Sequence, residues 1–459
     1  MKKFVVLFVV VALTCFSAVA FAADVTVGGS LEIRSRDFTN LNVVPDSFGN
    51  STSADSTYRD TQSRIRIDVN AKAGDVKGKI ELEQDFNTGG NDWGTGNDVL
   101  SNKVPGGVGY SNSTANGNLG FREAWISFNL PGIPVNVTGG HQLLALGNAW
   151  FFKSMHYGSE AWVVANQTGP NTFAFVNVKV LEGSINAADD IDAYALLDVF
   201  KISDAATVGI DLTNILDRKS LSPLPPNPVP NGTVGRDSLY NLGLNMNGKF
   251  GPVALKAEID QQFGKAKAAN LVTVGGIPSG DAKFKGNEIV VQGNVGLDPV
   301  TINFTAARGT GAKDQQTDIN QFVNFLDIDP HYTFLYEYKV VTAAGAKNTG
   351  FSNTEALSAG VSAAVTKSLV LGVDLWYLLA TQAVAINGAT VFGSTLPATS
   401  HKVGTEVDVK ANWQIAENLS WNWLLGYFAP GDAYDKNVNG VATKGDKVTG
   451  IQGVLAFKF

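Results

Sequence analysis

The stretch from Arg64 to Asp85, RIRIDVNAKAGDVKGKIELEQD, decides the fold. Its first half places an apolar side chain at every second position: Ile65, Ile67, Val69 and Ala71. After the tight turn Ala73-Gly74-Asp75, its second half places a charged side chain at every second position: Lys77, Lys79, Glu81, Glu83 and Asp85. A period of two is that of a β-strand. Because ionised side chains are costly to bury in a dry core, the stretch predicts a hairpin with one apolar face and one face in water.

The same alternation recurs along the rest of the chain, whereas helical spacing is nearly absent. It predicts about 18 strands, or about 16 as the alternative, since bacterial single-chain barrels have even numbers. The predicted strands are 25–36, 58–72, 76–86, 119–130, 135–146, 158–167, 172–182, 190–200, 206–216, 238–250, 253–264, 284–296, 299–309, 354–366, 368–381, 402–415, 418–428 and 447–459. The predicted fold class is therefore all-β: a transmembrane, antiparallel, up-and-down β-barrel.

The links between these strands alternate between short and long. Gly251-Pro252 and Asp298-Pro299 are short links, whereas residues 265–283 and 310–353 are long ones. Barrels of the outer membrane have short periplasmic turns and long external loops. The alternation therefore places every second link on the same side of a membrane.

The N-terminus has the layout of a secretory signal. Lys2 and Lys3 precede an apolar run from Phe4 to Leu13, and small residues follow up to Ala20-Phe21-Ala22. No later stretch approaches the roughly 18 consecutive apolar residues of a spanning helix. We expect a signal peptide over 1–22 and one barrel domain over 23–459, exported by the Sec route to the outer membrane of a Gram-negative bacterium.

The composition argues against several classes of function. Acidic residues outnumber basic ones, 42 to 35, which disfavours nucleic acid as a partner. The single cysteine, Cys15, lies in the predicted signal peptide, so the exported chain would have no thiol. The four histidines share no ligand spacing, and no nucleophile motif is present. We therefore expect no metal, no cofactor and no enzymatic activity.

A barrel of this size is wide enough to hold water, so inward polar side chains would line a channel. The lining residues predicted from the alternation are Arg34, Arg36, Arg64, Arg66, Asp68, Lys77, Lys79, Glu81, Glu83, Glu258, Asp260, Asp374, Glu406 and Asp408. The basic residues of the first three strands either select for anionic solutes or pair with neighbouring acids and stiffen the wall. The interleaved acids favour pairing, because they weaken any field of a single sign.

Aromatic residues gather on the outward positions of the last strands and predict a girdle at the membrane interface. The predicted girdle consists of Trp413, Trp421, Trp423, Tyr427, Phe457 and Phe459. The chain also ends on an amphipathic strand with an aromatic last residue, Phe459. This ending resembles the signal that the barrel-assembly machinery of Gram-negative bacteria recognises, so the expected partners are that machinery and outer-membrane lipid.

The longest predicted loop, 310–353, is rich in phenylalanine and tyrosine. Loops of this length are usually either functional or disordered. Two interpretations stay open: a plug that narrows the channel, or an external cap or hairpin above the membrane.

Two stretches resemble the alginate-export family of outer-membrane porins, which are 18-stranded barrels. The first is FREAWISF, residues 121–128, followed by Gly139-Gly140-His141-Gln142. The second is GTEVD, residues 404–408, followed by YFAPGD, residues 427–432. The resemblance implies Gln142, Glu406 and Asp408 as lumen residues, and the chain departs from the family at His141, where members tend to carry arginine. In overall style the chain is also similar to porins of deltaproteobacteria.

These observations predict a passive, water-filled channel for small hydrophilic solutes or ions. One alternative is a substrate-specific pore for an acidic polysaccharide or an oxyanion. Another is a barrel that acts as an interaction or structural partner, either as a cytochrome sheath or as an adhesin. The pattern leaves the oligomeric state open.

Overall fold

A computed structural model of the chain describes residues 24–41, 57–87, 119–182, 190–218, 237–266, 282–312, 318–327, 330–384, 399–438 and 441–459. The predicted signal peptide, 1–22, lies outside the described residues. No helix in the described ranges is long and apolar enough to cross a membrane.

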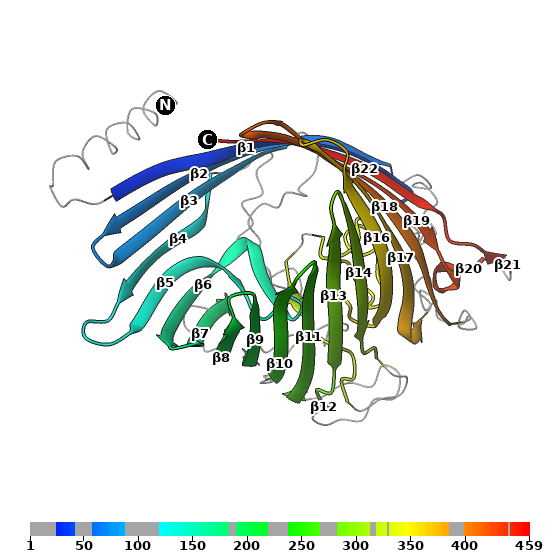
Figure 1. Cartoon of the computed structure of the whole chain (residues 1–459). Helices are drawn as coiled ribbons and strands as arrows, with labels where there is room; N and C mark the ends of the chain where they lie inside the picture. Colours follow the sequence, from blue (N-terminus) through cyan, green and yellow to red (C-terminus); the bar gives the residue numbers. More distant parts are fainter. Residues whose placement is uncertain are drawn as a thin grey trace, which may run out of the picture.

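The strands form one closed antiparallel barrel of 18 wall strands (Figure 1). Each wall strand pairs with the next along the chain, and the last pairs with the first over Ser30↔Lys458 to Thr39↔Thr449. Closure leaves no wall edge with unpaired backbone groups, which a membrane-spanning sheet requires. The count agrees with the larger of the two predicted numbers.

The wall strands are β1 (Asp24–Thr39), β2 (Tyr58–Ala73), β3 (Val76–Asn87), β4 (Gly120–Asn129), β5 (Val135–Ala145), β6 (Phe152–Thr168), β7 (Asn171–Leu181), β8 (Ile191–Ser203), β9 (Ala206–Asp217), β10 (Asp237–Phe250), β11 (Val253–Ala266), β13 (Asn287–Leu297), β14 (Val300–Gly309), β16 (Thr354–Ala364), β17 (Leu369–Val384), β18 (Ser400–Ala416), β19 (Leu419–Pro430) and β22 (Val448–Lys458). The short elements are β12 (Ala282–Lys283), β15 (Phe325–Leu326), the 3-10 helix η2 (Asp432–Tyr434), β20 (Lys436–Val438) and β21 (Val441–Thr443).

The two faces of the first hairpin are as the alternation predicts. Ile67 and Ile80 lie on the outer surface, where their side chains are 37 % and 44 % exposed. Arg64 and Glu81 point inward and are buried, each 3 % exposed. The outside of the barrel is thus apolar here, and the inside is charged.

All the predicted strands are present, but the predicted strand 158–167 is too short. β6 begins at Phe152, whereas its pairing with β7 begins only at Glu160. At the start of β6 the short strand β15 replaces β7 as the partner, pairing in parallel with Phe152 and Lys153. The sequence could not show this, because Phe325 lies far along the chain from its partner Phe152 and no periodic pattern links the two.

The described part of the long loop lies inside the barrel, which supports the plug and not the external cap. We call residues 318–327 and 330–353 the inner segment. Phe322 and Phe325 pack in one apolar cluster with inward side chains of β6–β10. Phe334 and Tyr336 pack in a second cluster with inward side chains of β1, β17 and β19. The inner segment therefore contacts opposite parts of the wall and narrows the lumen.

Candidate functional site

A network of charged side chains covers the inner wall of β1–β4. Arg64 donates to Asp85, with Nε 2.7 Å from Oδ1 and Nη2 3.0 Å from Oδ2. Arg66 donates to Glu83, with Nε 2.7 Å from Oε2. Arg36 is paired with Asp60 through Nε and Oδ1 at 2.8 Å. The predicted basic cluster is thus joined to acids of the neighbouring strands, which is the pairing that its interleaved pattern favoured.

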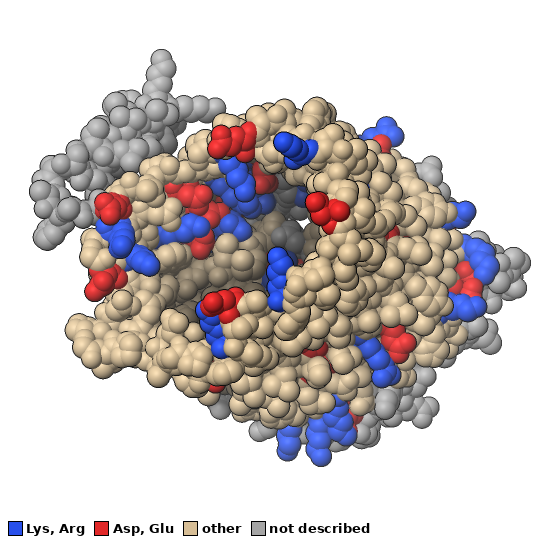
Figure 2. Space-filling model, viewed as in Figure 1, with Lys and Arg blue, Asp and Glu red and all other residues tan. Residues whose placement is uncertain are grey.

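Lys79 and Glu81 continue this network toward β4. Lys79 forms ion pairs with Glu81, at 2.9 Å, and with Glu123 and Asp68. Seen from outside, basic and acidic side chains mix on one side of the hollow in the barrel (Figure 2). Lys77, by contrast, lies exposed next to the short turn.

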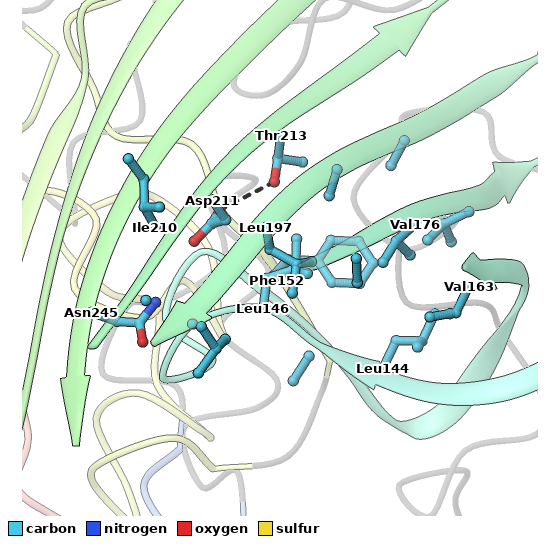
Figure 3. Close-up of a pocket in the computed structure, with 18 residues that line it drawn as sticks. Leu144, Leu146, Phe152, Val163, Val176, Leu197, Ile210, Asp211, Thr213 and Asn245 are labelled. Atoms are coloured by element: carbon cyan, nitrogen blue, oxygen red, sulfur yellow. Dashed lines mark hydrogen bonds between the residues drawn. The ribbon is translucent and has the colours of Figure 1, made fainter. Parts of the chain in front are cut away.

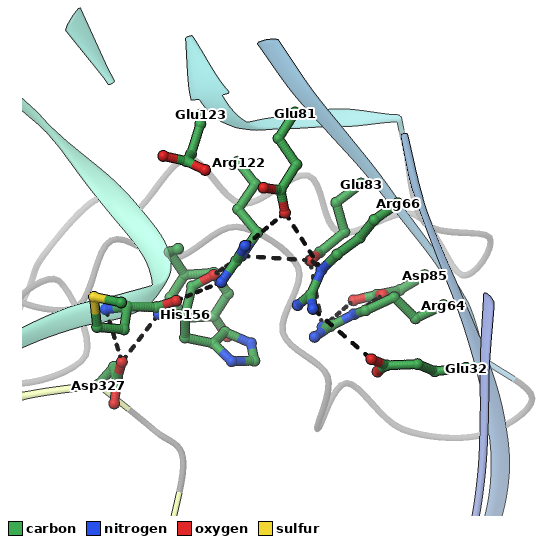
Figure 4. A network of polar contacts seen from close by, with 12 residues as sticks. Glu32, Arg64, Arg66, Glu81, Glu83, Asp85, Arg122, Glu123, His156 and Asp327 are labelled. Carbon is green, nitrogen blue, oxygen red and sulfur yellow. Dashed lines mark hydrogen bonds and ion pairs between the residues drawn. The ribbon is translucent and has the colours of Figure 1, made fainter. Parts of the chain in front are cut away.

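Arg122, which the alternation did not predict as a lining residue, joins the network to the inner part of β6. Its Nη1 lies close to Glu81 Oε1, at 2.5 Å, and its Nε donates to the carbonyl of His156 at 2.9 Å (Figure 4). A register irregularity opposite Glu81 and Leu82 lets Arg122 turn inward beside Glu123. A β-bulge breaks the strict alternation, so a period-two pattern cannot place two successive inward residues.

A second group of inward acids lies on β9, β11 and β13. Glu258 and Asp260 were predicted to line the channel, and both are buried on the inner face. Asp211 and Glu288 join them. No ion pair links these four carboxylates to a basic side chain within the described ranges.

Glu406 and Asp408 lie on the inner face; Asp408 is buried as well, and Glu406 is covered by the inner segment. Its carboxylate accepts hydrogen bonds from the backbone N–H groups of Leu335, at 2.6 Å, and Tyr336, at 2.8 Å. It is fully buried, so it holds the inner segment and does not line open water. The nearby Asp374 forms an ion pair with Lys410.

The remaining lining predictions concern Arg34 and Gln142. Arg34 Nη2 donates to Gln62 Oε1 at 2.6 Å, which places the guanidinium inside the barrel. Gln142 is also buried, and its amide donates to the carbonyl of Ala161 at 3.0 Å. Gln142 therefore braces β5 against β6.

The inner segment is also held by a buried group of ionisable residues around Asp327 and His331. Asp327 Oδ2 accepts the N–H groups of Met155 and His156, both at 3.0 Å. Lys153 lies 3.2 Å from Asp327 Oδ1. His331 lies between two carboxylates, with Nδ1 2.6 Å from Glu337 Oε1 and Nε2 3.4 Å from Asp327 Oδ1.

We expect the inner segment to loosen as the pH rises, because of His331. Burial lowers the pKa of His331, but Glu337 and Asp327 outweigh that effect, so the pKa is raised. The protonated ring thus stabilises the segment fully below about pH 6.5, the ordinary value, and the contribution is lost as the pH rises through the raised pKa. Current noise of the open channel should increase on the alkaline side, and His331→Gln should abolish that dependence. His401→Gln is the control and should keep the pH dependence of the wild type. If the noise of the wild-type channel does not change with pH, His331 does not have this role.

The predicted aromatic girdle lies on the outer surface. Trp413, Trp421, Phe457 and Phe459 are exposed near the ends of β18, β19 and β22 that adjoin short turns or the C-terminus. Trp423 lies beside Trp421, with ring centroids 5.1 Å apart. Tyr427 is exposed toward the opposite end of β19. These positions suit a lipid interface, and contact with lipid stays a prediction.

Comparison with known proteins identifies the architecture. No family model and no curated protein matches the chain. A BenF-like porin from Pseudomonas fluorescens Pf-5 is similar in structure, with a TM-score of 0.55 at 11 % identity over 96 % of this chain and 100 % of that one. OccAB4 of Acinetobacter baumannii has a TM-score of 0.53 at 10 % identity, over 94 % of this chain and 98 % of that one. OpdK of Pseudomonas aeruginosa, solved with vanillate, has a TM-score of 0.50 at 9 % identity, over 94 % of this chain and 98 % of that one. The chain has the fold of these porins.

Proposed function

We propose that this porin-like barrel is a passive channel of the outer membrane, through which small hydrophilic solutes and ions diffuse. The observation that supports this most directly is the closed 18-stranded wall, apolar outside and charged inside. Barrels of 16–18 strands enclose an aqueous channel. The inner segment would narrow that channel and set the size of the solutes that pass.

The proposal includes the route by which the chain reaches the membrane. Residues 1–22 would direct export and be removed, and the last strand, ending at Phe459, would be recognised by the barrel-assembly machinery. The outer membrane of a Gram-negative bacterium would then supply the lipid for the apolar surface.

A relation to the alginate-export family is the finer part of the proposal, supported by the FREAWISF and GTEVD stretches. We do not extend it to alginate as the solute. The inner wall of β1–β4 mixes acids with bases, and β9, β11 and β13 add acids that have no basic partner in the described chain. An acidic polysaccharide would meet repulsion along much of this lumen.

Conductance of the purified protein in a planar bilayer tests the channel. We expect steady, ohmic current steps in simple salt, and uptake of small neutral sugars by liposomes that contain the protein. A folded barrel that gives no current and no uptake would contradict the proposal and favour an interaction partner.

The charged network should set a weak ion selectivity. Arg64→Ala combined with Arg66→Ala leaves Asp85 and Glu83 without these partners, so the reversal potential under a salt gradient should shift toward cations. Glu83→Gln combined with Asp85→Asn should shift it the other way. Lys201→Ala, which removes an exposed basic residue near the end of β8, serves as the control. If neither double variant moves the potential, the network is structural only.

A further inference from the structure

A cavity of about 290 Å³ lies against the inner wall of β6–β9. It is enclosed on the lumen side by the link between β5 and β6, which folds inward (Figure 3). Most of its lining is apolar, including Val163, Val176, Ala195 and Leu197 from the wall, Leu146 from the link and Phe152 from the start of β6. The predicted wet inner face is therefore wrong for β7 and β8, whose inner faces are apolar as well.

One end of the cavity carries a carboxylate. Asp211 lies in the lining and is buried, 6 % exposed. Its hydrogen-bond partner is Thr213, whose Oγ1 donates to Oδ1 at 3.3 Å. Asn245 lies beside it and offers an amide to the same end of the cavity (Figure 3). A cavity with an apolar body and a single polar end is the usual form of a small-molecule site.

Further acids stand directly behind this end. Gly147 lies in the lining, and a Cβ atom there would come within 2.7 Å of Glu258 Oε2, so the absence of a side chain lets this carboxylate approach. Asp260 and Glu288 follow, and both are close enough to interact electrostatically with Glu258. Glu288 is 1 % exposed, and among the residues that the structure describes neither of its carboxylate oxygens has a hydrogen-bond partner.

No basic side chain of the described chain pairs with these acids; the N–H of Asn148 donates to Glu258, and the Asn241 amide donates to Asp260 at 2.6 Å. The basic residues of the lumen on β1–β4 are engaged with their own acids. A coordinated metal ion does not fit, because no three carboxylate or histidine groups within the described ranges are arranged to hold one. An organic cation can satisfy one carboxylate by direct contact and the others at longer range.

We propose that this cavity is a solute subsite for a compact amphipathic amine, whose apolar body fills the cavity and whose ammonium group contacts Asp211. The volume is at the small end of the range for ligand pockets, about 300–1,000 Å³, which suits one ring with a short aminoalkyl chain. The subsite deepens the proposed function and rests on it, since the amine must reach the lumen.

Calorimetric titration of the folded protein in detergent tests the subsite with phenethylamine as the probe. Three comparators separate the contributions: 2-phenylethanol keeps the size without the charge, ethylamine keeps the charge without the ring, and phenylacetate reverses the charge. We expect phenethylamine to bind about tenfold or more tightly than each of them, because the charged contact and the apolar contact are both needed. Equal binding of 2-phenylethanol or phenylacetate would overturn the proposal, as would no binding of phenethylamine.

Two substitutions locate the site. Asp211→Asn should weaken phenethylamine about tenfold and leave 2-phenylethanol unchanged. Ala195→Phe fills the cavity and should weaken both, with Ala195→Leu as a smaller change if the first variant does not fold. Asp374→Asn removes an inward acid that is paired with Lys410 and is not part of the cavity lining, so it should change neither. Binding that is insensitive to Asp211→Asn and to filling the cavity would overturn the assignment.

The same proteins distinguish failure of the subsite from failure of the channel. Current in simple salt, without amine, reports the channel alone. With phenethylamine added, the subsite predicts brief interruptions of the current. These interruptions should be shorter in Asp211→Asn than in the wild type. The channel could conduct but show neither amine-dependent interruptions nor heat of binding. That result would overturn the subsite and leave the proposed function intact.

Discussion

Replacing Glu406 by alanine should produce frequent transitions to a higher conductance level. The carboxylate of Glu406 accepts the N–H groups of Leu335 and Tyr336, and both groups would be left buried without this acceptor. A buried N–H group left without its acceptor costs about 1–3 kcal/mol, so leaving two of them costs about 3 kcal/mol or more. That energy corresponds to about a hundredfold rise in the population of a displaced inner segment. Single-channel recording measures it directly.

Asp374→Ala is the matched control for this prediction. It also removes an inward carboxylate, from the adjacent strand β17, but its ion pair is with Lys410 of β18. It should leave the conductance levels as they are. Identical recordings from wild type and Glu406→Ala would show that apolar packing, such as that of Tyr336 on Phe428, holds the segment by itself.

Deleting Phe459 should lower the amount of barrel in the outer membrane severalfold. The residue closes the wall: its N–H donates to the carbonyl of Gly29 at 3.1 Å, and its carbonyl accepts the N–H of Gly29 at 2.9 Å. Its ring lies over Gly29, where a Cβ atom would come within 2.8 Å of the ring. The aromatic terminus is also the expected recognition signal, so the loss in cells should exceed the loss on refolding in detergent.

Phe250→Ala provides the comparison, because Phe250 is also an exposed aromatic next to a short turn but is not at the C-terminus. It should have little effect on the amount of barrel, measured by blotting of membrane fractions. If membrane fractions contain equal amounts of barrel for the wild type and for the Phe459 deletion, Phe459 has no role in assembly.

The wall of this barrel could be predicted from the sequence because each wall strand repeats a local pattern. Outward Ile67 and inward Arg64 differ only in the parity of their positions, and parity is visible in the sequence. Pairing across each short turn follows from the length of that turn, and pairing across the long loops follows from the up-and-down order of the barrel. These two local rules are sufficient for the existence of the 18 strands and for the inward residues of β1–β3.

The interior could not be predicted in the same way, because it depends on contacts between distant segments. The pairing of Phe325 with Phe152 has no periodic signal, and Glu406 looks like any inward acid until the inner segment covers it. Arg122 was missed because a bulge breaks the alternation. The apolar inner face of β7 and β8 could have been recognised, since Val176 and Val178 interrupt the expected polar positions.

The most direct test of the account is the accessibility of single cysteines placed at successive positions of β2, from Arg64 to Val69. The single native cysteine, Cys15, lies in the predicted signal peptide, so the introduced thiol should be the only one in the exported protein. In liposomes, a small water-soluble thiol reagent should modify positions 66 and 68 and spare positions 65, 67 and 69, with position 64 slower because it is buried among its partners. Modification at every position, or at the outward positions alone, would contradict a barrel that is apolar outside and wet within.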